Sequence, residues 1–302
     1  MNGALLVTGF LAAAIRISTP LLFAATGELI NERAGVINLG IEGGMLAGAL
    51  AAAIGAAAGG PWLGVLAALL TGALVAGLFA LVAIGARANQ IITGTAVTLG
   101  SVGLTGAIYR SAFGVSGPAL SIPTFEAVRL PLLHAIPVIG SALFEQPALT
   151  YFGWLLIPLA GWFLFRSWWG LALRACGESP VAARASAVPV ERVRMLATLA
   201  GGALAGIAGA TLVLAQVGTF AERMTAGRGF IAIAIVVLGR WRPLGVFLAA
   251  LLFGAAGALQ FALQAMGLAA PYQLFLALPY LVALLALAGA TGKARAPAAL
   301  GE

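Results

Sequence analysis

The chain has 302 residues, of which 62% are apolar and 8% are charged, and its formal net charge is +7. A soluble domain carries about 25% charged residues, so this composition excludes a soluble protein and predicts a polytopic membrane protein with no sizeable soluble domain. The single cysteine, Cys176, excludes an internal disulfide, and the single histidine, His134, leaves no cluster of metal ligands.

Nine apolar segments are predicted to form helices, since a helix that crosses a membrane needs about 20 apolar residues. They are 4–26, 36–58, 62–85, 90–109, 148–166, 193–217, 225–239, 243–265 and 271–290. The seventh segment is short, which leaves a re-entrant helix as an alternative. The prediction is therefore an all-α transmembrane bundle with 8–10 spans, formed by one membrane domain over residues 1–302.

The third and eighth segments share a similar run, at residues 63–73 and 244–255. They run in opposite directions in the predicted topology, as the inverted repeats of transporters do. A background rich in Ala, Leu and Gly explains the similarity equally well, so both interpretations stay open.

Two further features predict how the spans pack. Glycine rows such as Gly202 and Gly206, followed by Gly209, let helix backbones approach closely. Within the first segment, Arg16 lies four residues before Pro20, whose missing N–H leaves the Arg16 carbonyl free and predicts a kink.

The most polar stretch close to the spans is 27–44, between the first two segments. It contains Glu28, Glu32, Arg33 and Glu42. Ionisable groups at membrane depth are costly, and irregular backbone is tolerated there only inside protein or beside water. The stretch therefore indicates a protein that moves a solute. Glu28, Glu32 and Arg33 are predicted at a gate or subunit contact, and a simple polar connection is the alternative.

The two long connections, 110–147 and 167–192, give the orientation. The second is the most basic, and positive residues mark the cytoplasmic side of a membrane. Placing it inside, with nine alternating spans, puts 11 of the 16 basic residues inside. The prediction follows that 110–147 and the N-terminus lie outside, and that a short tail, 291–302, lies in the cytoplasm.

No segment matches the phosphate-binding pattern G-x-x-x-x-G-K-[ST], so the chain is expected to carry no cofactor, and any ATP would be bound by a partner subunit. In the basic connection, Gly177 can end one helix and Ser179 can cap the next, with Pro180 at its first position. A short helix at about 180–187 is predicted, against which a cytoplasmic ATPase could push. A basic loop that only sets orientation is the alternative.

Hydrogen-bonding side chains within the spans are candidates for the lining of a translocation path. They are Asn38, Glu42, Thr93, Thr95, Thr98, Gln260 and Gln264. The two glutamines are four residues apart and so share a helix face. Hydrogen bonding between helices is the alternative role for these side chains.

The segment 173–184, LRACGESPVAAR, resembles the coupling loop of the permeases of ATP-binding-cassette (ABC) importers of the simple-sugar and nucleoside family. Residues 28–44 are similar to that family's N-terminal signature, most closely in the nucleoside branch, and 227–245 gives a third match. The length resembles that of the shorter of two paralogous permeases. One departure is Ala187, where the family often has glycine.

The resemblance implies that five residues couple the chain to an ATPase: Arg174, Gly177, Glu178, Pro180 and Arg184. It also implies a second permease, expected to be a paralogue, a cytoplasmic ATPase with two nucleotide-binding halves, and an extracytoplasmic substrate-binding protein. The chain would not be an enzyme, and it would carry nucleosides or related simple sugars across a bacterial-type inner membrane.

Two other functions are alternatives to that of an importer permease. An ion-gradient-driven secondary transporter of a small polar solute is favoured by Glu42 and by the faint inverted repeat, and it is disfavoured by the scarcity of carboxylates within the spans and the absence of aspartate. A membrane-embedded enzyme is disfavoured because the sequence offers no cluster of His, Asp or Cys.

Overall fold

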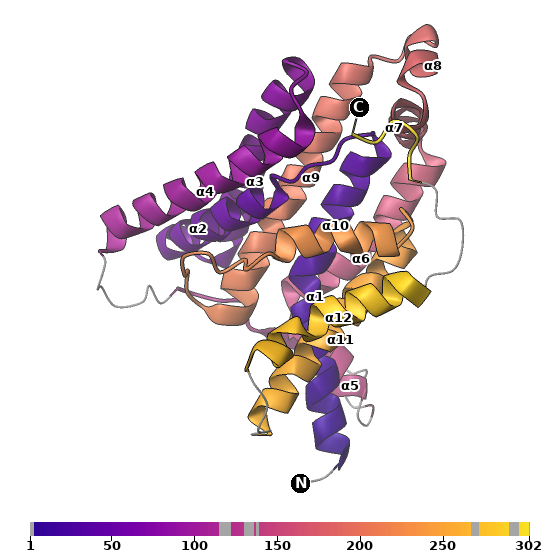
Figure 1. The fold of residues 1–302 in the computed structure, drawn as a ribbon. Coiled ribbons are helices and arrows are strands. Elements are labelled where there is room, and N and C mark those ends of the chain that lie inside the picture. Colours follow the sequence, from indigo (N-terminus) through magenta and orange to yellow (C-terminus); the bar gives the residue numbers. More distant parts are fainter. Residues whose placement is uncertain are drawn as a thin grey trace.

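The computed structural model describes residues 3–114, 122–129, 136, 139–266, 272–289 and 296–301. These residues are nearly all helical, which confirms the predicted all-α bundle (Figure 1). The connection 110–147 holds a short helix, α5 (Ile139–Phe144), and two strands, β1 (Ala127–Arg129) and β2 (Glu145–Pro147), that pair antiparallel with Val128 opposite Gln146. His134 lies outside the described residues.

Among the described residues, seven helices are long and apolar enough to cross a membrane, two of them after extension by the π-helical turns η1 (Leu81–Gly85) and η3 (Val213–Val217). They are α1 (Gly3–Arg33), α2 (Ile41–Gly59), α3 (Pro61–Ala80), α4 (Gln90–Phe113), α6 (Ala148–Arg166), α9 (Val190–Leu212) and α11 (Pro243–Ala265). The other helices are α7 (Trp168–Glu178), α8 (Pro180–Ala185), α10 (Arg228–Leu238) and the 18-residue apolar α12 (Tyr272–Gly289).

The seventh predicted segment, 225–239, does not cross the membrane. Its helix, α10, has 11 residues and extends about 16 Å, against about 30 Å for the hydrocarbon core. α10 runs across α1 in Figure 1 and contacts α1, α2 and α11. The re-entrant alternative therefore fits the fold better than a ninth alternating span.

α9 lies at the centre of the bundle, in contact with α1, α2 and α3. Its glycines make these contacts possible: a Cβ on Gly206 would lie 2.0 Å from the Ala68 carbonyl oxygen, and one on Gly209 would lie 2.0 Å from that of Met45. The predicted role of this glycine row in close packing is confirmed.

The carbonyl group that Pro20 leaves free inside α1 has a partner. The side-chain amide of Gln216, on η3, donates a hydrogen bond to the carbonyl oxygen of Arg16. The Arg16 side chain donates to Oε1 of Gln146 at 3.2 Å. Side chains from two distant elements thus satisfy polar groups that the middle of a long apolar helix exposes.

Basic residues gather at one end of the bundle, as the predicted orientation requires. Arg87, Arg184 and Arg194 line one cavity, and Arg33 and Arg174 stack on one phenyl ring nearby. The first residues of α1 lie at the opposite end from this group and from the segment 296–301 (Figure 1). We refer to the basic end as the cytoplasmic end.

The close packing of α9 yields a stability prediction. Gly206→Ala places a methyl group against the backbone of α3, which overpacks the contact and is expected to lower the free energy of unfolding by about 1–3 kcal/mol. Thermal unfolding of the detergent-purified protein measures this. The control is Gly103→Ala on α4, where a Cβ would meet nothing within 4 Å, and equal unfolding temperatures for the two variants would contradict the packing account.

Candidate functional site

The polar stretch 27–44 forms the last turns of α1, a short turn and the start of α2. The first predicted segment ends at residue 26, but the helix continues to Arg33 because Glu, Leu and Arg favour helix and their polar groups find partners inside the protein. Glu28 and Glu32 are 0% and 1% exposed. These carboxylates are therefore buried helical residues rather than parts of an open loop.

Glu42 holds the start of α10. Its Oε1 accepts hydrogen bonds from the Thr225 hydroxyl at 2.6 Å and the Gly227 N–H at 2.8 Å, and its Oε2 accepts one from the Gly229 N–H at 2.6 Å. A helix N-terminus has unpaired N–H groups and a positive dipole end, so a carboxylate there is doubly favourable. A Cβ on Gly229 would lie 2.6 Å from the Glu42 Cα, which explains the glycine.

Glu32 and Arg33 hold the other end of α10. The Trp241 indole N–H donates to Oε2 of Glu32, and the Arg33 guanidinium donates from Nε to the Trp241 carbonyl oxygen at 2.9 Å. Arg240 and Trp241 have φ values of +54° and +52°, which side-chain-bearing residues rarely adopt. This turn between α10 and α11 is therefore fixed by the end of α1.

Glu28 organises the turn between α1 and α2. Its Oε1 accepts from the Asn38 N–H and its Oε2 from the Asn31 amide, both at 2.8 Å. All three carboxylates of the stretch thus accept hydrogen bonds from neighbouring turns or helix ends. The predicted role of Glu28, Glu32 and Arg33 at a gate or subunit contact stays a prediction, and their bonds place them beside α10.

The residues predicted to line a path divide into separate groups. Asn38 and Thr98 lie at the α1–α2 turn, where Thr98 donates to the Leu39 carbonyl oxygen at 3.0 Å and Asn38 accepts from the Gly40 N–H. Thr93 is buried in the same region of α4, whereas Thr95 is exposed on another face of that helix. The structure does not bring these side chains together with the two glutamines of α11.

Gln260 lines a cavity of about 240 Å³ between α1, α10, α11 and α12. Its polar neighbours there are Arg228, at the start of α10, and Tyr280 of α12, among apolar and aromatic walls. Arg228 donates to the Met224 carbonyl oxygen at 2.9 Å. The side-chain nitrogen of Gln264 is buried and has no hydrogen-bond partner among the described residues. Apolar walls with a few polar groups are typical of small-molecule sites.

The predicted short cytoplasmic helix is confirmed as α8. Ser179 caps it by accepting a hydrogen bond from the Ala182 N–H at 3.3 Å, and Pro180 occupies its first position. The helix ends at Ala185, two residues earlier than predicted, because Ala187 is left-handed with φ of +60°. This conformation favours glycine, which explains the glycine that the resembling family often has here.

The outer surface of α8 is available to a partner. Val181 is 75% exposed, and Arg184 is exposed and paired with Glu191 at 2.7 Å. Arg174 lies beneath, with its guanidinium carbon 5.1 Å from the centre of the Phe165 ring.

Gly177 joins the base of α8 to the end of α1 and to the segment 296–301. A Cβ on Gly177 would lie 2.3 Å from the Arg33 carbonyl oxygen. The Gly177 carbonyl accepts from the Ala299 N–H at 2.9 Å, and the Gly301 N–H donates to the Gly35 carbonyl at 3.1 Å. The sequence predicted 291–302 only as a tail, since no motif in it signals docking.

Two more side chains complete this junction. Arg194, on α9, donates from Nε to the Ala34 carbonyl oxygen at 3.1 Å. Glu178 is exposed, and its charge acts on Arg33. The Cys176 thiol is buried, and burial raises its pKa, so at neutral pH it is an uncharged packing group.

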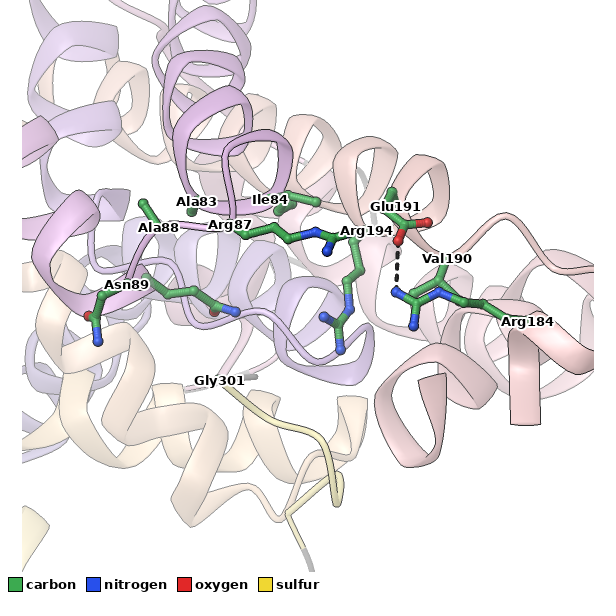
Figure 2. Close-up of a pocket in the computed structure, with 11 residues that line it drawn as sticks. Ala83, Ile84, Arg87, Ala88, Asn89, Arg184, Val190, Glu191, Arg194 and Gly301 are labelled. Atoms are coloured by element: carbon green, nitrogen blue, oxygen red, sulfur yellow. Dashed lines mark hydrogen bonds and ion pairs between the residues drawn. The ribbon is translucent and has the colours of Figure 1, made fainter. Parts of the chain in front are cut away.

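Beside this junction lies a cavity of about 530 Å³, shown in Figure 2. Its walls come from the turn after η1, from α8, from the start of α9 and from Gly301. Figure 2 shows Arg87, Arg184 and Arg194 around this space, with Glu191 joined to Arg184. Arg184 of α8 therefore shares a cavity with residues of the turn between η1 and α4.

Comparison with known proteins agrees with these features. The family described as the permease component of branched-chain amino acid transport systems matches residues 10–287. A Bacillus subtilis guanosine ABC transporter permease is 34% identical over 94% of this chain and 92% of its own length. A Lactococcus lactis nucleoside ABC transporter permease is 35% identical over 78% of this chain and 77% of its own.

A Haloferax volcanii protein, named provisionally as a glucose ABC transporter permease, is 41% identical over 86% of this chain and 79% of its own length. No solved structure matches this chain significantly.

The hydrogen bonds of Glu42 yield a prediction. Glu42→Gln keeps one acceptor oxygen but turns an NH₂ group toward donors, so at least one of three bonds is lost, at about 1.5–3 kcal/mol for a bond to a charged group. Thermal unfolding followed by tryptophan fluorescence is expected to show a lower transition temperature for Glu42→Gln. Glu126→Gln, at an exposed position, is the control, and an unchanged transition for Glu42→Gln would contradict the account.

The junction at Gly177 yields a second prediction. Gly177→Ala forces α7 away from the end of α1 and is expected to reduce solute uptake roughly tenfold, while ATP hydrolysis by the partner continues. Both rates are measured in proteoliposomes of the whole transporter. Gly161→Ala, where a Cβ meets nothing within 4 Å, is the control, and normal uptake per ATP by Gly177→Ala would exclude a coupling role.

Proposed function

This chain belongs to the family of ABC importer permeases, so it is a multi-pass inner-membrane transport subunit whose ATP is hydrolysed on a separate chain, and we propose that its solute is a nucleoside or a related simple sugar. The observation that carries the substrate proposal is the similarity to a guanosine permease over 94% of the chain. The relative named for glucose keeps simple sugars in the proposal.

The chemistry of the α11 cavity supports a neutral, polar solute. Gln260 and Tyr280 offer hydrogen bonds, and Phe253 and Phe261 offer aromatic faces. Arg228, the cation of this cavity, already donates to backbone carbonyl groups. A branched-chain amino acid, which the family description names, carries a carboxylate and an ammonium group. The described lining contains no acidic side chain to pair with that ammonium group.

The proposed partners follow from the family and from the exposed surface of α8. An ATPase and a substrate-binding protein accompany permeases of this family. The proposal adds an ATPase with two nucleotide-binding halves, a second permease that is a paralogue of this chain, and no cofactor bound by the chain itself. In the proposed cycle the binding protein delivers solute outside, and closure of the ATPase moves α8. Arg174, Gly177, Glu178, Pro180 and Arg184 transmit that movement to the spans.

The environment of Glu42 disfavours the alternative function, an ion-gradient-driven secondary transporter. Glu42, the carboxylate that favoured it, already accepts three hydrogen bonds within the fold. An ion-coupled carboxylate must exchange its partners during each cycle, and exchange here would release the start of α10.

Uptake of radiolabelled guanosine, uridine, ribose and glucose tests the proposal, in cells with and without this chain. Loss of nucleoside uptake is expected, with the same loss when the partner ATPase carries an inactivated P-loop lysine. Lost sugar uptake with intact nucleoside uptake would move the substrate to simple sugars. Uptake that survives ATPase inactivation and collapses with the proton gradient would overturn the ATP-driven cycle.

A further inference from the structure

The cytoplasmic cavity of Figure 2 is strongly cationic. Three arginines, Arg87, Arg184 and Arg194, surround it against one carboxylate, Glu191. Glu191 is paired with Arg184, and the charge of Arg87 also acts on it. The described residues of the lining therefore carry a net positive charge of about two, which favours an anionic occupant.

An apolar groove lies close to this cavity, along α3 and α9. It has a volume of about 570 Å³ and lies between α3 and α9, where Leu74, Leu78, Leu81, Met195 and Leu199 line it. Leu74 is 73% exposed, so the groove is open at the side.

The two spaces follow one another along both helices. Ala80 lines the groove and Ile84, four residues later, lines the cavity, while on α9 Met195 lines the groove and Glu191, four residues earlier, lines the cavity. α3 and α9 both cross the membrane, and the cavity lies at their cytoplasmic ends. An arginine-lined cavity at the cytoplasmic end thus lies one helical turn from an apolar groove that runs along α3 and α9.

We propose that an anionic phospholipid of the cytoplasmic leaflet binds here, with its phosphate in the arginine cavity and an acyl chain in the α3–α9 groove. The positive lining matches the phosphate, and the groove matches the chain. Basic pockets at the cytoplasmic ends of membrane helices bind such headgroups in other proteins.

Given the proposed coupling role of α8, the site would act on coupling because its lining comes from two separate elements. Arg184 belongs to α8, and Arg87 belongs to the turn between η1 and α4. A phosphate held by both would connect the coupling helix to the α3–α4 turn. Anionic lipid is therefore expected to change the amount of solute moved per ATP hydrolysed.

The test is native mass spectrometry of the purified transporter titrated with phosphatidylglycerol, with phosphatidylcholine as the neutral comparison. Arg87→Gln is expected to weaken phosphatidylglycerol binding about fivefold, which corresponds to about 1 kcal/mol for one arginine near a membrane surface. Arg192→Gln is the matched control, since Arg192 is an exposed arginine on α9 that is not part of the cavity lining. Equal binding by the two variants would overturn the proposal.

A second variant separates the lipid from a free anion. Leu78→Trp fills the groove and leaves the arginines in place, so it is expected to weaken phosphatidylglycerol binding without changing the effect of inorganic phosphate on thermal stability. If Leu78→Trp has no effect on lipid while Arg87→Gln abolishes stabilisation by phosphate, the site binds a free anion and the lipid proposal is wrong.

A third outcome assigns the cavity to a protein partner. If Arg87→Gln keeps its lipid but releases the ATPase during purification, an acidic group of the ATPase occupies the cavity. That result would also overturn the proposal.

Discussion

The hydrogen bonds between the Glu42 carboxylate and the start of α10 are the constraint on which the rest of the membrane domain depends. A helix of 11 residues cannot cross the bilayer, so both of its ends lie within the protein, where unpaired N–H and C=O groups are costly. Glu42 satisfies the first end, and Arg33 binds the turn after the second. With both ends fixed, α10 presents Arg228 beside Gln260 in the α11 cavity.

The same end of α1 also carries the junction to which we assign the coupling role as a proposal. Gly177, at the base of α8, touches the Arg33 carbonyl oxygen, and the Arg33 side chain holds Trp241 after α10. A continuous set of contacts therefore leads from the cytoplasmic helix, through one turn of α1, to the short membrane helix. The segment 296–301 is hydrogen-bonded to both Gly177 and Gly35. A displacement of α8 would therefore act on elements that are already bonded to one another.

Local sequence signals predicted the long apolar helices and α8. Each depends on neighbouring residues: hydropathy over about 20 positions for a span, and Ser179 with Pro180 for the start of α8. Contacts between distant residues could not be predicted in this way. The bonds of Glu42 to Gly227 and of Arg33 to Trp241 join residues far apart in sequence, and so does the docking of Ala299 on Gly177. The sequence marked the stretch 27–44 as unusually polar for a membrane protein, but the buried partners of its carboxylates became visible only in the fold.

The residues predicted for the path show the same limit. Their types were chosen for hydrogen bonding, yet Thr98 and Asn38 bond within the α1–α2 turn, and Gln260 lies in a different cavity. The two groups of polar residues are joined through Glu42, which lies next to the α1–α2 turn and also holds the start of α10. A movement of α10 would therefore act on both groups at once.

The close match between residues 63–73 and 244–255 gains a physical basis from the helix crossings. Gly72 lies where α3 meets α9, and a Cβ added there would lie 2.2 Å from the Gly202 carbonyl oxygen. Gly254 lies where α11 meets α1, and a Cβ added there would lie 2.3 Å from the Ala14 carbonyl oxygen. The two glycines occupy corresponding positions of the two runs, and each allows a central helix to approach closely. An inverted repeat stays a prediction, but these equivalent crossings are what it requires. Many other helical glycines of this fold, such as Gly48 and Gly209, also lie close to a neighbouring backbone, so the packing of small residues accounts for both positions with or without a repeat.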